Sequence, residues 1–350
     1  MTTPDVPLMR SVLVTSEDDI RVEEVPRPDP GPGEVLVRTS TVGICGTDLH
    51  ASAGHHPFID LPYHPGHELV GVVEELGQGV DGYRPGDRVT VEPNLACGRC
   101  RQCGEGRYNI CEQLAVFGCQ TAGGMADYFA IAADRLHAVP QGMSDQLAAL
   151  AEPLATPVHA VRRAGIGPGS RVAVLGAGPI GLLVLVAARQ AGAEAVVVTD
   201  VLPGKRERAL ALGADAALAA DDADLVAQAR LALGGPADVV LDCVARESSM
   251  SQAVDLVVKG GTVVVVGIAA GATPVPLHLV QDREIAVVGS LMYVREDFER
   301  ALQLLSSGVV AAEDLVTATF PLERAAEAFA AGRRPEHVKV LVTVGAGVSA

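Results

Sequence analysis

The sequence predicts an α/β chain with two domains, an antiparallel, barrel-like β domain followed by a doubly wound parallel sheet. Three observations support this prediction. The chain has 350 residues, which suits two cores better than one. Short β-branched runs separated by Pro and Gly fill the N-terminal part, as in antiparallel sheets. After Glu152, short apolar runs alternate with Ala- and Leu-rich stretches of helical length, a pattern typical of parallel sheets with crossover helices.

The individual elements follow from these patterns in chain order. In the N-terminal part we expect strands at residues 11–14, 34–39, 69–76 and 87–91, with turns at 31–34 and 84–87. In the second part we expect buried strands at 171–176, 195–200, 238–243 and 262–267, with helices at 181–192 and 203–212. Helices at 298–307 and 323–331 and a strand at 337–343 complete the chain.

Composition excludes several classes of protein. Apolar residues make up 49% of the chain, so we expect a sizeable core and not a disordered chain. The net charge of −16 opposes binding to the phosphates of nucleic acids. We see no secretory signal and no apolar run long enough to span a membrane, so we expect a cytoplasmic protein. In that compartment the seven cysteines indicate metal binding rather than disulfides.

A glycine-rich segment predicts a dinucleotide site. Residues Gly176, Gly178 and Gly181, with Pro179 and Ile180 between the last two, form G-x-G-x-x-G directly after an expected strand and at the start of an expected helix. Glycines in this context let backbone N–H groups approach a pyrophosphate at the helix N-terminus.

An acidic residue at the end of the next strand bears on the choice of cofactor. Asp200 lies where a carboxylate bonds the ribose hydroxyls of NAD and repels the 2′-phosphate of NADP. The alternative is that Asp200 caps the helix that begins near Pro203. The cations Lys205 and Arg206 lie close by and weaken the preference for NAD, with Lys205 a further candidate for cofactor binding.

Four cysteines with close spacing predict a structural zinc site. Cys97, Cys100, Cys103 and Cys111 lie within 15 residues, with intervening glycines that permit tight turns. Four thiolates close a tetrahedral shell around one zinc ion and leave no position for chemistry. A nucleic-acid-binding zinc knuckle is disfavoured because the segment lacks interleaved aromatic residues.

A second, more dispersed set consists of Cys45 in GICGTDLH, His67 and Glu68 in PGHE, and Glu152 in AEPLA. Together with the cysteine quartet, GAGPIG and VVVTD, these motifs resemble the zinc-containing medium-chain alcohol dehydrogenase family along essentially the whole chain. Glu at position 152 resembles the branch of sorbitol, polyol, butanediol and threonine dehydrogenases. The resemblance implies a GroES-like catalytic zinc-binding domain at 1–154, a Rossmann NAD-binding domain at 155–292, and a C-terminal return to the catalytic domain at 293–350.

The same resemblance implies roles for single residues. Cys45 and His67 bind a catalytic zinc, and Glu68 or Glu152, or each in turn, completes its shell. The Thr47 hydroxyl takes the alcohol proton and His50 relays it towards solvent. The alternative for His50 is a surface residue after a turn.

Several neighbouring residues have less specific interpretations. Asp48 is expected to fix the loop or support the metal ligands. His55, His56 and His64 are interpreted as loop residues, although His56 or Phe58 could touch substrate. Cys119 and Cys243 have no spacing partner, and Cys243 is interpreted as packing.

The leading hypothesis is a zinc-dependent oxidoreductase that transfers hydride from a secondary alcohol, a polyol, sugar alcohol or diol, to NAD. A threonine-type amino-alcohol dehydrogenase or a cyclitol or aminocyclitol dehydrogenase is the alternative within this class. A catalytically silent nucleotide-binding protein would be expected to have lost Cys45, Thr47 or His67, and a zinc-free reductase would lack the quartet. The resemblance also implies a homodimer or homotetramer, with residues 283–292 near the sheet edge that associates.

Overall fold

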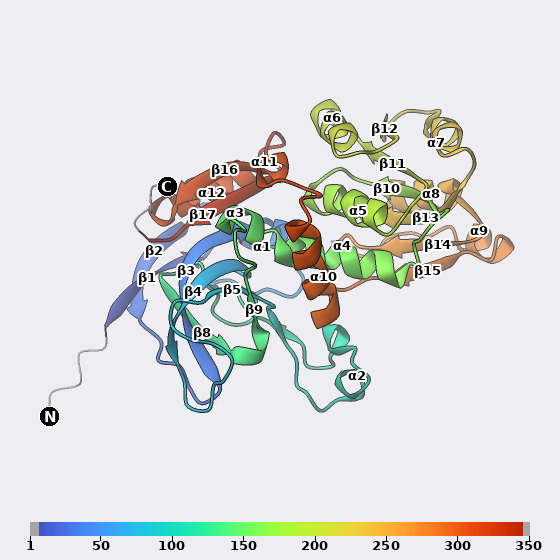
Figure 1. The fold of residues 1–350 in the computed structure, drawn as a ribbon. Coiled ribbons are helices and arrows are strands. Elements are labelled where there is room, and N and C mark those ends of the chain that lie inside the picture. The colour runs from blue at the N-terminus through green and yellow to red at the C-terminus, as the bar shows by residue number, and fades with distance from the viewer. Residues whose placement is uncertain (1–6, 270, 346–350) are drawn as a thin grey trace, which may run out of the picture. The chain divides into compact units, whose positions relative to one another are not determined.

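The structure is a computed structural model that describes residues 7–269 and 271–345. The chain forms two compact units, one of Met1–Glu152 with Ala311–Ala350 and the other of Pro153–Val310. Figure 1 shows the course of the chain through both units.

The first unit is a mostly antiparallel β structure. Its strands are β1 (Leu8–Val14), β2 (Ile20–Pro26), β3 (Glu34–Ile44), β4 (Glu68–Leu76), β5 (Arg88–Val91), β6 (Asn94–Leu95), β7 (Ala115–Val116), β8 (Tyr128–Ala132), β9 (Leu136–Ala138), β16 (Val316–Pro321) and β17 (Lys339–Thr343). Its short helices are α1 (Gly46–Ser52), α2 (Arg101–Gly104), α3 (Asp145–Ala148), α11 (Ala312–Leu315) and α12 (Ala325–Gly332), with 3-10 turns η1 (Tyr108–Ile110), η2 (Ala133–Arg135) and η3 (Leu322–Arg324).

The main sheet of this unit has seven strands in the order β16-β17-β3-β4-β5-β9, with β8 also paired to β3. The long strand β3 is buried along most of its length and is therefore central to the core. Strand β17 pairs antiparallel with β3 and brings the C-terminal segment beside residues 41–44. Because β16 and β17 are parallel to each other, the sheet is not antiparallel throughout.

The second unit is a parallel sheet with crossover helices. Its elements are α4 (Ala151–Arg163), β10 (Arg171–Leu175), α5 (Pro179–Gln190), β11 (Ala195–Asp200), α6 (Pro203–Ala211), β12 (Ala216–Ala219), α7 (Leu225–Leu233), β13 (Ala237–Asp242), α8 (Glu247–Leu256), β14 (Val257–Val265), α9 (Leu277–Asp282), β15 (Ala286–Gly289) and α10 (Arg295–Ser306). The strand order is β12-β11-β10-β13-β14-β15, and every pairing is parallel.

The order of strands in the parallel sheet fixes where a ligand binds. The chain runs outward from β10 through β11 to β12, then returns to β13 on the other side of β10. Ligands of such sheets bind beyond the carboxyl ends of the strands where the direction reverses, here next to β10. The buried strands β10 and β13 supply apolar side chains to a core that includes Ala173, Leu175 and Val240.

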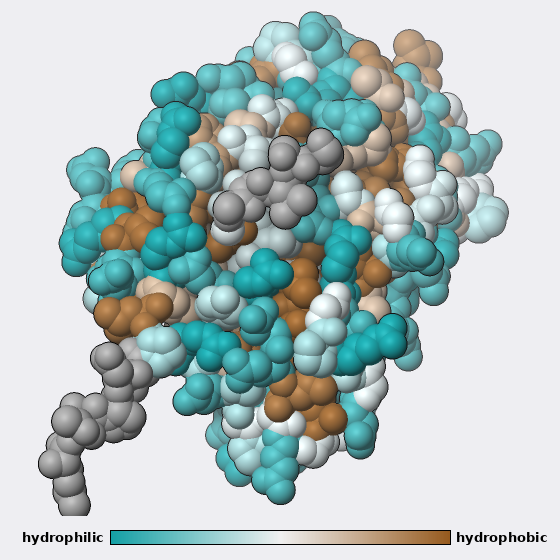
Figure 2. All heavy atoms as spheres, turned by 60° about the vertical axis from the view of Figure 1, so that its left-hand side comes forward, coloured by the Kyte–Doolittle hydropathy of each residue, from teal (hydrophilic) through white to brown (hydrophobic). Residues whose placement is uncertain are grey.

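The predicted fold class, a largely antiparallel β domain with a doubly wound parallel sheet, is confirmed. Residues 293–310, which we expected to return to the first domain, group with the second unit instead. The physical reason is α10, whose Asp297 is fully buried and bonds His159 and Arg162 of α4. The described residues contain no helix that is long and apolar enough to cross a membrane. On the face in Figure 2, apolar residues form small patches among hydrophilic side chains.

Candidate functional site

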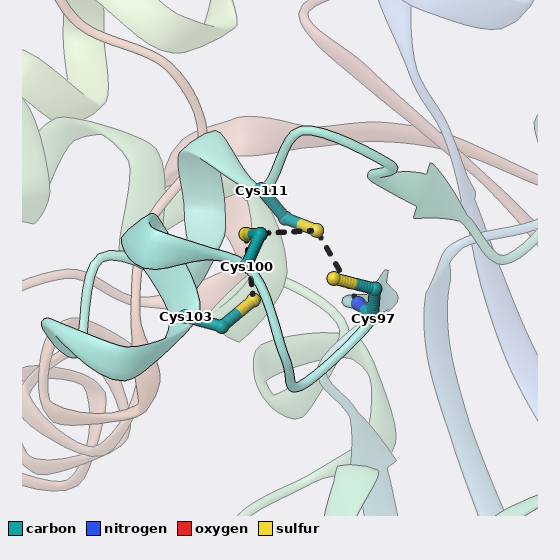
Figure 3. A group of neighbouring side chains, drawn as sticks. All are labelled: Cys97, Cys100, Cys103 and Cys111. Atoms are coloured by element: carbon teal, nitrogen blue, oxygen red, sulfur yellow. Dashed lines mark hydrogen bonds between the residues drawn. The ribbon is translucent and has the colours of Figure 1, made fainter.

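The four closely spaced cysteines converge in space. The sulfur atoms of Cys97, Cys100, Cys103 and Cys111 all lie within 4.8 Å of one another. Figure 3 shows the side chains pointing toward a common centre from the loop around α2. Gly98 and Gly106 have positive φ values of 69° and 75°, which a side chain would strain, so the turns require glycine.

The electrostatics of the quartet favour a cation. Backbone N–H groups, first that of Glu112, lower the pKa of Cys100 to about 6. Burial and the neighbouring thiols raise the pKa of Cys103 to about 12, because another thiolate beside the first is disfavoured. A divalent cation would remove this repulsion and keep all four sulfurs as thiolates. The donor set therefore fits a closed zinc site.

A second group joins three donors from different parts of the first unit. The ligand atoms of Cys45, His67 and Glu68 lie within 4.8 Å of one another. Cys45 follows β3 and caps α1, while Glu68 begins β4. The pairing of β3 with β4 places Gly43 opposite Glu68 and so brings the two ends together. His67 and Glu68 are buried, at 5% and 0% exposure, so this is an internal site.

Asp48 and Cys119 flank His67 on one side. The Nδ1 atom of His67 is 4.0 Å from Asp48 Oδ1 and 3.8 Å from Cys119 Sγ. Asp48 also accepts hydrogen bonds from the Cys45 N–H at 2.9 Å and from the Tyr63 hydroxyl at 3.2 Å. Burial by itself lowers the pKa of His67, but Cys119 and Asp48 raise it well above its usual value. The surroundings of His67 therefore favour a positive charge, which a metal ion would supply.

Glu68 carries a partner that the sequence did not reveal. The Lys339 ammonium lies 2.6 Å from Oε1 and 2.8 Å from Oε2 of Glu68, and donates to the carbonyl of Ile44 at 3.2 Å. Lys339 is 3% exposed. Burial by itself lowers the pKa of Lys339, but the charges of Glu68 and Cys45 raise it above its usual value, so the ammonium is retained.

Glu152 lies in the first turn of α4 and is buried at 7% exposure. It does not belong to the three residues whose ligand atoms converge. It lies within electrostatic reach of Lys339 and therefore near the same centre. The structure thus brings Cys45, His67 and Glu68 together and leaves Glu152 as a neighbour.

The two expected proton carriers lie on α1. Thr47 is partly buried and His50 is exposed, and a separation of three residues puts them on one side of the helix. His56 is partly buried, and burial followed by the charges of His50 and His67 lowers its pKa. His56 therefore lies within electrostatic reach of this centre. His64 instead bonds Ser11 Oγ at 3.0 Å as a loop residue.

The glycine-rich segment has the geometry that a dinucleotide needs. Gly176 directly follows β10 and has φ 93°, and a Cβ on Gly181 would lie 1.8 Å from the Gly176 carbonyl oxygen. Only glycine permits this approach between the loop and α5. Gly178 caps α5 and Pro179 occupies its first turn, and the N–H groups of a first turn have no partner within the helix.

Asp200 lies at the carboxyl end of β11 and holds the glycine-rich loop. Its Oδ2 accepts from the Ala177 N–H and its Oδ1 from the Leu202 N–H, both at 2.9 Å. Asp200 thus bonds both the glycine-rich loop and Leu202, the residue that precedes α6, and its role toward a cofactor stays a prediction. Arg206 donates to the backbone carbonyl of Asp200 at 2.9 Å, so a cation lies against the backbone of this residue.

The sequence did not reveal that exposed apolar residues lie along one edge of the parallel sheet. Exposed large apolar side chains follow the carboxyl ends of four strands: Val201 at 57%, Val244 at 37%, Ile268 at 54% and Leu291 at 49% exposure. Exposed apolar residues gathered at the binding edge of such a sheet suit the flat rings of a nucleotide. Each is an ordinary strand-end residue in the sequence, so only the strand order reveals the row.

Comparisons with known proteins agree with this geometry. The family models "Alcohol dehydrogenase GroES-like domain" and "Zinc-binding dehydrogenase" match residues 31–141 and 179–307. L-galactonate-5-dehydrogenase of Escherichia coli K12 is 37% identical over 86% of this chain and 88% of its own. Sorbitol dehydrogenase of Gallus gallus is 35% identical over 95% of both chains. A zinc-binding dehydrogenase of Sinorhizobium meliloti 1021, solved with NADP bound, superposes with TM-score 0.89 at 34% identity, covering 96% of this chain and 99% of that one.

Proposed function

Because this chain belongs to the alcohol dehydrogenase family of zinc-binding dehydrogenases, we propose that it oxidises a secondary alcohol of a polyol, sugar alcohol or diol to a ketone, with NAD as hydride acceptor. The observation that carries this proposal is the buried convergence of Cys45, His67 and Glu68 within 4.8 Å. A thiolate, an imidazole and a carboxylate are donors that zinc takes in catalytic sites, which keep one position open for substrate.

Two sets of residues would hold metal. Cys45 and His67, with Glu68 or Glu152, would hold a catalytic zinc, and the cysteine quartet would hold a structural one. When bound, the catalytic zinc supplies the Lewis acidity that favours loss of the alcohol proton, and NAD supplies the hydride acceptor. Since the cysteines must be thiolates, a reducing compartment such as the cytoplasm suits the chain.

Two side chains of helix α1 would carry the proton of the substrate hydroxyl to solvent. The hydroxyl of Thr47, two residues after Cys45, would accept the proton of the substrate hydroxyl. His50 is exposed at the end of α1 and would pass that proton to solvent. Asp48 holds the start of α1 through the Cys45 N–H at 2.9 Å, which fixes the segment that carries both groups.

NAD is the cofactor that Asp200 favours. The glycine-rich loop, comprising Gly176, Gly178, Pro179, Ile180 and Gly181, would bind the pyrophosphate. The carboxylate of Asp200 would face the adenosine ribose and repel a 2′-phosphate. Arg206 beside it, and Lys205 one residue earlier, would reduce that discrimination, and the Sinorhizobium relative was solved with NADP. We therefore expect turnover with both cofactors and a higher kcat/KM with NAD.

The substrate class is supported by the charged character of the site and by the relatives. Buried carboxylates and an ammonium beside the metal ligands suit a polar, hydroxylated substrate. The relatives named above act on sorbitol and L-galactonate. A panel of polyols, diols, amino alcohols and cyclitols, assayed with NAD and with NADP, tests this. Turnover of amino alcohols alone would favour the threonine-type alternative, and turnover of none would contradict the proposal.

Self-association through β15 completes the proposal. This strand is the last of the parallel sheet, and Ala286, Val287 and Gly289 are exposed on it. An edge strand with apolar, exposed residues presents unpaired N–H and C=O groups to another strand. A second copy of the chain would pair there and extend the sheet across a two-fold axis, giving a homodimer or, with a further interface, a homotetramer.

A further inference from the structure

We propose that Asp242 and Ser249 are positioning residues that hold a strained turn, residues 243–246, as a fixed surface for the nicotinamide half of the cofactor. The turn follows β13, in the middle of the parallel sheet. This inference rests on the proposed function, because it requires a dinucleotide at this edge of the sheet. It adds two residues that no sequence motif indicated.

The turn contains a residue in a strained backbone conformation. Ala245 has a φ of 56° and is buried at 6% exposure. Residues with a Cβ rarely adopt this left-handed conformation, and such strain persists only where the surrounding structure imposes it, often at ligand sites. Met292, with a φ of 46°, follows β15 at the same edge of the sheet. The strain therefore lies at the edge where a dinucleotide binds.

Asp242, the last residue of β13, holds the turn through its side chain. The residue is fully buried, and its Oδ1 accepts hydrogen bonds from the Val244 N–H at 2.9 Å and the Ala245 N–H at 3.0 Å. A buried carboxylate is costly unless it is hydrogen-bonded, so the turn stays wrapped around Asp242. The backbone carbonyl of Asp242 also accepts from the N–H groups of Val266 and Gly267, both at 2.9 Å, which ties the end of β14 to the same residue.

Ser249, in the first turn of α8, completes the set of hydrogen bonds. Its Oγ donates to Oδ2 of Asp242 at 2.9 Å and accepts from the Arg246 N–H at 2.9 Å. The Cys243 N–H donates to the Leu175 carbonyl of β10 at 3.0 Å. Each of the four N–H groups of the turn thus has an acceptor, and the side chains of Asp242 and Ser249 supply three of these bonds.

The turn packs against two glycines at the binding edge. A Cβ on Gly176 would lie 2.7 Å from Val244 Cγ2, and a Cβ on Gly267 would lie 2.9 Å from the carbonyl carbon of Cys243. Both distances are too short for a real side chain, so the turn lies directly against the glycine-rich loop and the segment that follows β14. Since Val244 is also exposed, the turn presents an apolar side chain next to the loop that would bind the pyrophosphate.

The strand order assigns this surface to one half of a dinucleotide. Sheets of this kind consist of two mononucleotide-binding halves, which meet where the strand order reverses, here between β10 and β13. Asp200, the residue proposed for the adenosine ribose, ends β11 and belongs to the half formed by β10, β11 and β12. The turn follows β13 and therefore belongs to the nicotinamide half. Its displacement should weaken the binding of NADH and leave the binding of AMP unchanged.

The test measures dissociation constants for NADH and for AMP by isothermal titration calorimetry, with the thermal midpoint as the measure of folding. Ser249→Ala breaks the link between Asp242 and Arg246, and we expect the Kd for NADH to rise about tenfold, the equivalent of one lost buried hydrogen bond. The Kd for AMP, which lacks the nicotinamide half, should not change. Ser251→Ala, at an exposed position of the same helix, is the matched control and should change neither constant.

A second variant, Ala245→Gly, removes the strain and keeps the hydrogen bonds. Glycine adopts a φ of 56° freely, so the thermal midpoint should stay the same or rise. The turn becomes less rigid, and we expect the Kd for NADH to rise by about twofold to fivefold while that for AMP is unchanged. A turn that only stabilised the sheet would leave the affinity for NADH unaltered.

Unchanged affinity for NADH in either folded variant would overturn the inference. Equal losses of affinity for NADH and AMP would also overturn it, because the turn would then act on the whole site and not on the nicotinamide half. If Ser249→Ala does not fold, Ala245→Gly decides by the same criterion. A wild-type chain that binds NADH and oxidises no polyol would contradict only the proposed function, whereas a chain that binds no NADH would contradict both.

Discussion

At the scale of single residues, the buried centre around Cys45 consists of charged groups that compensate one another. His67 sits between Asp48 and Cys119, and Glu68 lies under Lys339. Removing one member of such a buried set leaves its partner uncompensated, which costs more than the contact itself contributes. Substitutions of these buried residues should therefore lower zinc content and turnover together. A substitution that lowers turnover without lowering zinc content would instead identify a residue that acts on the substrate.

The first prediction concerns Thr47. Replacing Thr47 by Ala removes the hydroxyl that accepts the substrate proton, and we expect kcat/KM for a polyol to fall about 10²- to 10⁴-fold. Thr47→Ser keeps the hydroxyl and should retain most of the activity, with zinc content unchanged in both variants. Equal kinetics for Thr47→Ala and wild type would remove Thr47 from the proton path.

The second prediction concerns His50. His50→Ala should lower kcat near neutral pH and recover at alkaline pH, where solvent hydroxide can accept the proton directly. Stopped-flow and steady-state rates measured across the pH range check this. His55→Ala, in the loop that follows α1, is the matched control. A variant with full turnover at neutral pH would show that His50 is only a surface residue.

Which residues could be predicted from the sequence depends on how local their signal is. The cysteine quartet and the glycine-rich loop are contiguous, so their spacing alone indicates the geometry. Lys339 lies 271 residues from Glu68, and nothing beside it in the sequence marks it. Cys119 had no spacing partner, yet the fold places it 3.8 Å from His67. Contacts that strand pairing creates between residues distant in sequence belong to no local motif and so could not be predicted.

At the scale of elements, the loop of the cysteine quartet depends on its metal. The segment has short helices and few buried apolar residues, and Tyr108 of η1 links it to the barrel through a 2.6 Å bond to Glu92. Because four thiols cannot all be ionised without a cation, the loop and the metal stabilise each other.

The third prediction follows from this dependence. Cys103→Ser should release one zinc per chain and lower the thermal midpoint, because structural zinc contributes directly to folding free energy. Metal analysis and calorimetry measure both effects. Cys243→Ser, outside both metal sets, should keep all the zinc. Full zinc content in Cys103→Ser would contradict a closed four-cysteine site.

In the second unit, a buried hydrogen-bonded ion pair joins α4 and α10. Asp297 is 1% exposed and accepts hydrogen bonds from Arg162 Nε at 2.7 Å and the Val294 N–H at 3.1 Å, with His159 Nδ1 at 2.8 Å. Burial by itself raises the pKa of Asp297, but the bonds from His159 and Arg162 lower it to about 2. The ionised carboxylate therefore stabilises the folded state.

The fourth prediction concerns how the stabilisation contributed by ionised Asp297 depends on pH. Since the pKa is lower in the folded state, the stabilisation is present above the unfolded value near 4 and is lost as the pH falls towards 2. Asp297→Asn should cost roughly 2 kcal/mol at neutral pH and clearly less at pH 3. Chemical denaturation at both pH values measures this, with the exposed Asp282→Asn as control. A cost independent of pH would contradict the ionic role.

The sequence predicted most strands of the second unit, and in the first unit it predicted β1, β3, β4, β5 and β17 but not the other strands, because alternating and continuous apolar runs are strong local signals only in the longer strands. It missed the parallel pairing of β16 with β17 and the grouping of α10 with the second unit. Neither is a matter of local propensity. The first depends on which strand edge is free. The second depends on the buried face of α10, which includes Asp297, an ordinary acidic residue near a helix start in the sequence.

At the scale of the whole molecule, the edge strand β15 sets the fifth prediction. Val287→Lys places a charge on the edge and should convert the oligomer to a monomer in analytical ultracentrifugation, since charged edges oppose strand pairing. Leu231→Lys, at an 85% exposed position on α7, should leave association unchanged. An oligomer that survives Val287→Lys would place the interface elsewhere.

The central claim is that a metal held by Cys45 and His67 is required for oxidation of a polyol by NAD. The most direct measurement is the rate of NADH formation with a polyol substrate before removal of the more weakly held zinc by a chelator, after removal, and after zinc is added back. We predict that activity is lost with the first zinc released while the fold persists, and returns in proportion to zinc restored. Unchanged activity in chains that have lost that zinc would contradict the account.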